Sequence, residues 1–133
     1  MASKPETNFT NRLRKLLPKS IYVMKNNNVY VGGVPDLWLS GSKSDLWLEM
    51  KYVDPLPVSV PVRPAKLLSE LQMQWLDNRY NEGRKVAVII GCKTGGVILR
   101  DHAWKDEIPA HQFKALIRSH GDLAEWITEE LEA

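Results

Sequence analysis

Cysteine is nearly absent from this chain, since Cys92 is the single one among 133 residues. One cysteine cannot form an internal disulfide, and such sparse use is typical of proteins kept in a reducing compartment. No apolar run approaches the roughly 18 residues that a membrane span needs, and the first residues lack the apolar segment of a signal peptide. We therefore expect an intracellular, cytoplasmic protein that makes no membrane contact.

Several motifs that define large enzyme classes are also missing. The sequence has no Walker loop, no dinucleotide fingerprint and no serine-centred nucleophile elbow. The three histidines and Cys92 do not show the paired spacing of a zinc site. These absences argue against nucleoside triphosphatases, nicotinamide-dependent oxidoreductases, serine hydrolases and zinc proteins.

The overall composition of the chain indicates one globular domain. Hydrophobic residues make up 44% and charged residues 26%, enough for a core beneath a charged surface. Residues 1–66 hold ten Lys and Arg against five Asp and Glu, whereas residues 67–133 hold eight against eleven. The basic half suits a polyanionic substrate such as nucleic acid, although an uneven surface charge alone gives the same pattern.

The most informative segment is a hairpin over residues 36–49. Both arms alternate apolar and polar residues, and residues 41–44 have the composition of a turn. If the turn centres on residues 42 and 43, the predicted cross-strand pairs are Ser40 with Asp45, Trp38 with Trp47, and Asp36 with Glu49. Paired side chains share a face of the sheet, with Cβ atoms roughly 5 Å apart.

Two carboxylates at so short a distance from each other destabilise a sheet unless a cation lies between them. Mg²⁺ prefers hard oxygen ligands and needs only one or two carboxylates beside a phosphate. Lys51 lies two residues after Glu49 and so points to the same face. The alternative is a solvated face on which Lys51 bridges Asp36 and Glu49, and two large aromatics on that face weigh against it.

Hydrophobic periodicity predicts the other elements. We expect helices over residues 3–17, 68–82, 111–119 and 122–131, and strands over 21–24, 29–31, 86–90 and 97–99. The proline-rich segment 54–64 cannot join the interior of a sheet, so it serves as a connector or as a loop that contacts DNA. The acidic, amphipathic tail 119–133 is expected to dock on the domain or on a partner.

At this point the chain resembles the PD-(D/E)XK nuclease superfamily, and within it most closely the VRR-NUC-type domains. The resemblance rests on residues 33–36 (Gly-Val-Pro-Asp), residues 49–51 (Glu-Met-Lys) and the helix segment 68–75. It covers roughly residues 5–100 of a single domain spanning residues 1–133, and leaves residues 101–133 as a C-terminal helical extension. The proline-rich segment is longer than the usual spacing in the family.

The resemblance implies an α/β fold with a restriction-endonuclease-like αβββαβ core, a central mixed sheet flanked by helices. It also implies cleavage of phosphodiester bonds in DNA with Mg²⁺, for which Mn²⁺ substitutes. Several members of the superfamily act on branched DNA such as Holliday junctions, often as homodimers. We expect the same activity, cofactor and partners here.

The family pattern assigns roles around the predicted pair of acids. Asp36 and Glu49 would hold the metal ion, with the Met50 backbone carbonyl as a further ligand. Lys51 would orient the attacking water or neutralise charge on the phosphate.

Two more residues have family roles but also a purely structural interpretation. Gln72 would position Lys51 or the phosphate, and Glu6 would support the metal shell. However, Ser69 with Gln72 and Ser3 with Glu6 both have the spacing of a helix capping box. The sequence leaves both interpretations open.

Contacts to DNA are expected from side chains around the site. The candidates are Arg12, Lys15, Arg63, Lys66, Trp38 and Trp47. The two tryptophans either stack on bases or pair with each other to stabilise the hairpin by about 0.2–1 kcal/mol.

Two rival functions use the same residues. One is a nicking or DNA-processing nuclease with no preference for junctions. The other is a DNA-binding module that has lost catalysis, which the joint presence of Asp36, Glu49 and Lys51 weighs against.

Overall fold

The computed structural model describes residues 3–26 and 32–133, and the predicted strand at 29–31 lies outside them. The elements in chain order are α1 (Lys4–Leu16), β1 (Tyr22–Lys25), β2 (Leu37–Ser40), β3 (Asp45–Tyr52), α2 (Pro64–Leu67), α3 (Glu70–Asn81), β4 (Val86–Cys92), β5 (Gly95–Leu99), the 3-10 turn η1 (Ala103–Lys105), α4 (Ala110–Leu116) and α5 (His120–Glu132). This is the mixed α/β fold that we expected.

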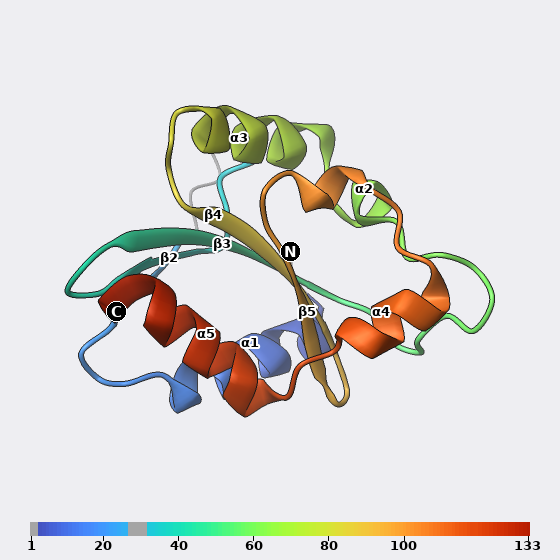
Figure 1. The fold of residues 1–133 in the computed structure, drawn as a ribbon, viewed down its shortest axis with the longest axis horizontal. Coiled ribbons are helices and arrows are strands. Elements are labelled where there is room, and N and C mark those ends of the chain that lie inside the picture. The colour runs from blue at the N-terminus through green and yellow to red at the C-terminus, as the bar shows by residue number, and fades with distance from the viewer. Residues whose placement is uncertain (1–2, 27–31) are drawn as a thin grey trace.

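The described strands form a five-stranded sheet in the order β1-β2-β3-β4-β5. Neighbouring strands are antiparallel except for β3 and β4, which run parallel because the chain crosses over through α2 and α3 between them. Figure 1 shows α1 and α5 on one face of the sheet and α2 and α3 on the other.

Each face of the sheet has its own hydrophobic core. One core joins α1 and α5 to the inner face of β2, β3 and β4, and includes Phe9, Leu39, Leu48 and Ile127. The second joins β4 and β5 to the segments on the opposite side and includes Leu76, Val88, Trp104 and Phe113. The strand predicted at 86–90 is thus buried on both faces, as its continuous apolar run indicated.

Serine residues begin the three longest described helices. Each serine hydroxyl oxygen accepts a hydrogen bond from the backbone N–H three residues later. The donors are Glu6 to Ser3, Gln72 to Ser69 and Asp122 to Ser119. The cap at Ser69 also explains a correction. The predicted helix 68–82 is α3, which begins only at Glu70 because Ser69 caps it and which ends at Asn81, while the short α2 precedes it as a separate helix.

Three further expectations need correction. The helix predicted at 111–119 ends at Leu116, because Arg118 pairs in an isolated bridge with Gly96 and Ser119 caps α5. The predicted joint at His120 and Gly121 is the first turn of α5 instead. The apolar periodicity of residues 68–82 predicts Leu71 on the buried side of the helix, but Leu71 is 57% exposed.

The acidic C-terminal segment docks on its own domain. Residues of α5 such as Leu123, Ile127 and Leu131 are fully buried against the sheet and α1. The proline-rich segment stays outside the sheet and makes one isolated bridge, between Val62 and Ile108. Within the residues that the structure describes, no helix combines the length and apolar character that crossing a bilayer requires.

Candidate active site

The hairpin has the predicted register. Leu37 pairs with Leu48, Trp38 with Trp47 and Ser40 with Asp45, so paired residue numbers sum to 85 as expected. Asp36 immediately precedes β2, and its backbone N–H donates to Glu49 Oε1 at 3.0 Å. The two acids therefore face each other at the end of the hairpin.

Each of these carboxylates is held by the backbone of the opposite strand. Glu49 accepts from the Asp36 N–H, and Asp36 Oδ2 accepts from the Met50 N–H at 3.3 Å. Because the N–H and C=O of one residue in an extended strand point to the same side, the Met50 carbonyl points toward Asp36 as well. The two carboxylates thus converge between the strands, and the Met50 carbonyl as a further ligand stays a prediction.

Lys51 and Gln72 complete the surroundings of Glu49. The Lys51 ammonium lies 3.6 Å from Glu49 Oε2, and the Gln72 side-chain N–H donates to the same oxygen at 3.1 Å. Gln72 Oε1 also accepts the Ser69 N–H at 2.9 Å, which completes a capping box. One end of the Gln72 amide therefore caps α3, which confirms the structural interpretation, and the other end bonds Glu49, while the role toward Lys51 or the phosphate stays a prediction.

Glu49 occupies a strongly perturbed electrostatic environment. It is 1% exposed, and burial, together with the nearby Asp36 carboxylate, raises its pKa from 4.5 to about 8. The Lys51 ammonium acts in the opposite direction but does not offset the burial. One lysine is too little positive charge for this pair of acids.

Glu6 approaches the same group of residues from α1. Burial raises its pKa, Lys51 lowers it and Asp36 raises it, so its carboxylate feels the charges of the site. Among the described residues, however, no three His, Cys, Asp or Glu side chains lie close enough together to hold a metal ion. In this geometry Glu6 does not complete a three-carboxylate set with Asp36 and Glu49.

The donor set fits a hard divalent cation. Two carboxylates and a carbonyl are oxygen ligands of the kind that Mg²⁺ takes, with water filling its other positions. A cation would also relieve the repulsion that raises the Glu49 pKa. The residues that would hold it are Asp36 and Glu49, with the Met50 carbonyl beside them.

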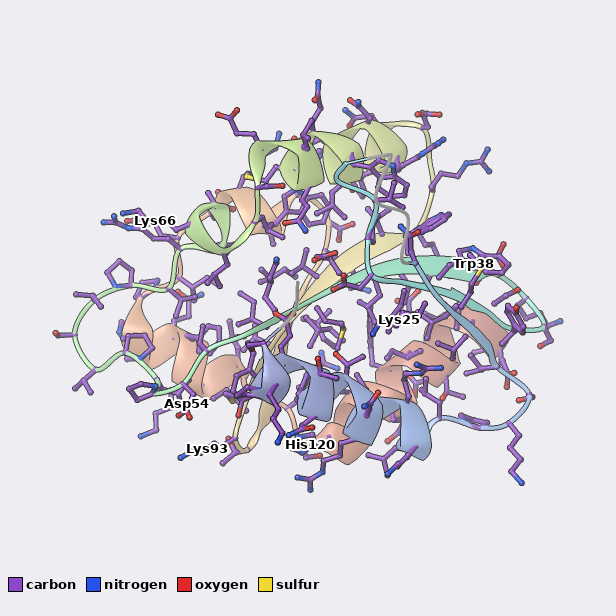
Figure 2. The ribbon with its side chains drawn as sticks, turned by 180° about the vertical axis from the view of Figure 1, so that it is seen from behind. Lys25, Trp38, Asp54, Lys66, Lys93 and His120 are labelled. Carbon is purple, nitrogen blue, oxygen red and sulfur yellow. The ribbon has the colours of Figure 1, made fainter. Side chains whose placement is uncertain are left out.

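The predicted DNA contacts are spread over different surfaces. Arg12 and Lys15 are exposed on α1, across the sheet from α3. Arg63 forms an ion pair of 2.7 Å with Glu107, while Lys66 extends away from the end of α2 (Figure 2). Trp38 lies on β2, apart from those groups.

The two hairpin tryptophans pack together, and a third joins them. Trp38 and Trp47 have ring centroids 6.3 Å apart, which supports the interpretation as a cross-strand pair. Trp75 of α3 lies edge-on to Trp47 at 5.1 Å. The apolar spacing of residues 68–82 predicts core packing for Trp75, and Trp75 does pack against the second core.

Gly33 has a structural role beyond its place in the motif at residues 33–36. Gly33 has a φ of +86°, and a Cβ there would lie 2.3 Å from the Leu71 carbonyl oxygen. The loop that carries Asp36 can therefore approach the first turn of α3, which carries Gln72, only with glycine at this position. The adjacent Gly32-Gly33 pair was the available signal.

This close approach can be tested with two matched substitutions. Gly83 has a similar φ of +83° but open space around it, so Gly83→Ala adds only the conformational penalty of about 1–2 kcal/mol. Gly33→Ala should lower the free energy of unfolding by clearly more, because the methyl group also collides with backbone. Equal midpoints for the two variants in chemical unfolding would contradict the close approach.

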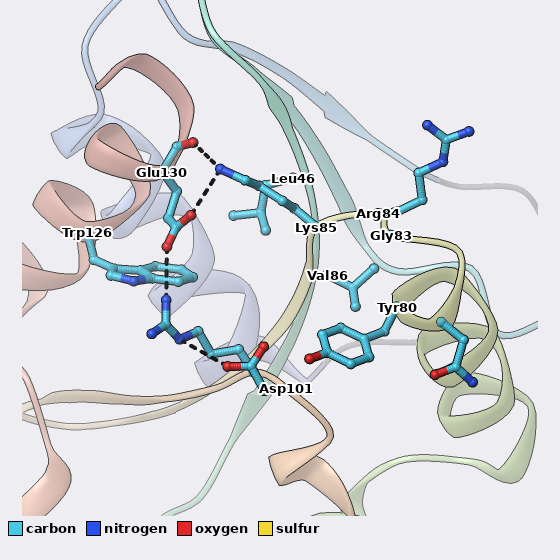
Figure 3. Close-up of a pocket in the computed structure, with 11 residues that line it drawn as sticks. Leu46, Tyr80, Gly83, Arg84, Lys85, Val86, Asp101, Trp126 and Glu130 are labelled. Carbon is cyan, nitrogen blue, oxygen red and sulfur yellow. Dashed lines mark hydrogen bonds and ion pairs between the residues drawn. The ribbon is translucent and has the colours of Figure 1, made fainter.

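A separate pocket of about 580 Å³ lies beside the first residues of β3 and β4, and Glu49 is not among the residues that line it. It is lined by Leu46, Tyr80, Arg100 and Trp126 among others (Figure 3). Glu130 accepts hydrogen bonds from both Lys85 and Arg100 there. These ion pairs fasten α5 to the start of β4 and the end of β5, so we assign this pocket a structural role.

The fold is that of restriction-endonuclease-like nucleases, with a mixed five-stranded sheet between helices and the two acids on its central hairpin. Among solved structures, the chain is similar to Hjc, a Holliday junction resolvase from the archaeal hyperthermophile Archaeoglobus fulgidus. The TM-score is 0.57 at 12% identity, over 96% of this chain and 98% of that one. The likeness in fold thus extends into residues 101–133, which the sequence resemblance left out.

The other comparisons found no relatives. No protein-family model matches this sequence, and no curated protein matches it either. At 12% identity, the structural likeness establishes the fold alone.

Proposed function

We propose that this protein is a metal-dependent nuclease that hydrolyses phosphodiester bonds in DNA. The observation that carries the proposal is the convergence of Asp36, Lys51 and Gln72 on the buried Glu49 carboxylate. A carboxylate pair with an adjacent lysine is the chemistry that phosphodiester hydrolysis needs, and it lies in a fold that a nuclease shares.

The metal ion would be Mg²⁺, with Mn²⁺ able to replace it. In a site of this kind the ion supplies polarisation of the phosphoryl oxygens and stabilisation of the leaving oxygen. Asp36 and Glu49 would bind the ion. Glu6 would not bind it directly but would act on the ligands around it through the charge of its carboxylate.

The remaining side chains of the site would act on water and phosphate. The Lys51 ammonium, whose side chain is 20% exposed, can meet solvent and substrate while it stays beside Glu49. It would orient the attacking water or neutralise charge that develops on the phosphate. Gln72 would hold the Glu49 carboxylate in place through its side-chain N–H.

We further propose branched DNA as the substrate and a homodimer as the active form. The similarity to a protein described as a Holliday junction resolvase supports the first. Cutting two strands of a junction symmetrically needs two active sites, so the second follows from the first. Sedimentation that finds only monomers on bound junction DNA would contradict the homodimer.

The test of the function is cleavage of labelled four-way, flap, single-stranded and linear duplex DNA with Mg²⁺, Mn²⁺ or EDTA. We expect products with Mg²⁺ or Mn²⁺ and none with EDTA. Binding of DNA with no cleavage under any metal condition would favour the rival interpretation, a catalytically inactive DNA-binding module.

The two roles of Gln72 can be separated by mutation. Ser69→Ala removes the cap that accepts the Gln72 N–H, and should lower the free energy of unfolding by about 1 kcal/mol without changing the cleavage rate. Gln72→Leu removes the bond to Glu49 and should lower the rate by about tenfold or more. If both variants lose stability and neither loses activity, Gln72 is only a cap.

A further inference from the structure

The face of the sheet that carries Asp36 and Glu49 continues into a row of exposed and partly buried aromatic and apolar side chains. We call this row the aromatic face, and it consists of Tyr22, Met24, Trp38, Trp47 and Trp75. Adjacent rings are 5.1–6.3 Å apart from Tyr22 through to Trp75. Tyr22 is 61% exposed and Met24 42% exposed.

This face is open because the helices on its side cover only part of the sheet. The second hydrophobic core draws its described members from β3 onward, and none comes from β1 or β2. On the other face, Leu37 and Leu39 of β2 are buried under the first core. The same two strands thus contribute to the first core on one side, while on the other side, where Trp38 lies (Figure 2), no described residue of theirs belongs to the second core.

The aromatic face is continuous with the candidate active site. Trp38 lies two residues after Asp36, and Trp47 two residues before Glu49, on the same face of their strands. Trp75 lies on the same helix as Gln72. A polymer held on these rings would therefore pass directly beside the carboxylates.

A groove next to the rings carries positive charge. It has a volume of about 540 Å³, and Arg79, Arg84 and Lys85 line it with Trp38 and Trp47. Arg84 has no ion pair among the described residues, while Arg79 and Lys85 are paired with Glu82 and Glu130. Asp45, the acid in the groove, accepts a hydrogen bond from Ser40.

Rings flanked by cations match one occupant, a nucleic acid strand whose bases are unpaired. Bases stack on aromatic side chains, and cationic side chains contact the phosphates between them. A paired duplex keeps its base faces stacked inside and cannot offer them to the rings. A second copy of this chain would set the same three cations against each other.

We propose that the aromatic face binds an unpaired DNA strand next to the phosphate to be cut. The substrate class is then branched DNA with a single-stranded segment at the branch, such as a flap or splayed end, in preference to fully paired duplex DNA. This inference rests on the proposed nuclease function and narrows it.

The first test measures binding without cleavage. Fluorescence anisotropy in EDTA compares a labelled 15-nucleotide oligothymidine with a duplex of the same length. Wild type should bind the single strand more tightly, Trp38→Ala and Tyr22→Ala should each weaken that binding about tenfold, and duplex binding should not change. Trp38→Phe should keep most of the affinity, because it keeps a ring.

Controls separate stacking from a loss of structure. Leu116, an exposed apolar residue of α4, serves as a matched surface site, and Leu116→Ala should bind as wild type does. Thermal unfolding shows whether Trp38→Ala folds. If Trp38→Ala does not fold, Tyr22→Ala still tests the inference, since the Tyr22 side chain is mostly exposed.

Three results would overturn the inference. The first is that wild type binds single strand and duplex with equal affinity. The second is that folded Trp38→Ala and Tyr22→Ala bind the single strand as tightly as wild type. The third is that metal-free wild type forms a dimer that Tyr22→Ala converts to monomers. The last result would identify a second copy as the occupant. Failure of the nuclease proposal is distinct, because it is absence of cleavage with Mg²⁺ and leaves these binding measurements intact.

Discussion

Glu49→Gln should reduce Mg²⁺-dependent cleavage by roughly 10³-fold, the scale of losing one strong electrostatic contributor in a buried site. The substitution keeps the shape of the side chain, including an oxygen that can accept the Asp36 N–H. It removes the negative charge, and a neutral amide is a much weaker partner for a divalent cation. Asp36→Asn should have an effect of the same size.

Isothermal titration with Mg²⁺ or Mn²⁺ separates binding from chemistry. Both amide variants should lose metal binding, whereas Lys51→Met should keep it and still cut about 10²-fold more slowly. Glu125→Gln, an exposed acid of α5 on the other side of the sheet, is the matched control and should behave as wild type. Undiminished metal binding in Glu49→Gln would remove the basis of the proposed mechanism.

Without metal, the protein should lose stability as the pH rises from about 5 to 8. The pKa of Glu49 is raised to about 8 in the folded protein, against 4.5 as the ordinary value. Between these values the folded state holds a proton that the unfolded state has released, so the free energy of unfolding falls with pH. Because one pKa unit corresponds to about 1.4 kcal/mol, the fall should amount to a few kcal/mol.

Comparison with Glu49→Gln isolates this effect from other titrating groups. Burial lowers the pKa of His120, so its neutral form is favoured and stability rises with pH up to about 6.5, in the opposite sense. The raised pKa of Glu6 acts in the same sense as that of Glu49. Both contributions remain in Glu49→Gln, so the difference between the two stability curves reports Glu49.

The measurement is thermal unfolding at several pH values, with EDTA and with Mg²⁺. The midpoint of the metal-free wild type should fall on the order of 10 °C relative to Glu49→Gln across this range. Mg²⁺ should remove most of the difference, because it binds the ionised carboxylates and stabilises the folded state. Parallel curves for the two proteins in EDTA would show that Glu49 is not perturbed by its surroundings.

Much of the fold could be predicted from local patterns. The buried strand at 86–90 and the helix caps at Ser3 and Ser69 follow from short stretches of sequence, because the physical causes are local. The helix boundaries at Ser69 and at Leu116 were wrong, since a cap and a pairing with β5 decided them. Apolar periodicity continues through both boundaries and does not mark them.

The candidate site, too, was predictable from the sequence only in part. The opposition of Asp36 and Glu49 was predictable, because side chains in a strand alternate and a short turn leaves one register. The two roles of Gln72 and the place of Gly33 against Leu71 were not, because both depend on where α3 lies over β3. No local sequence pattern encodes the position of α3 relative to β3.

The sequence by itself thus determined which residues share a face of the hairpin, through the two-residue period of a strand and the composition of one turn. Only the tertiary structure decided that α3 brings Gln72 to Glu49 and that no described residue of β1 or β2 joins the second core beside Trp38. The physical reason is that these features come from packing between segments far apart in the chain. Their positions depend on how two cores fill on opposite faces of one sheet.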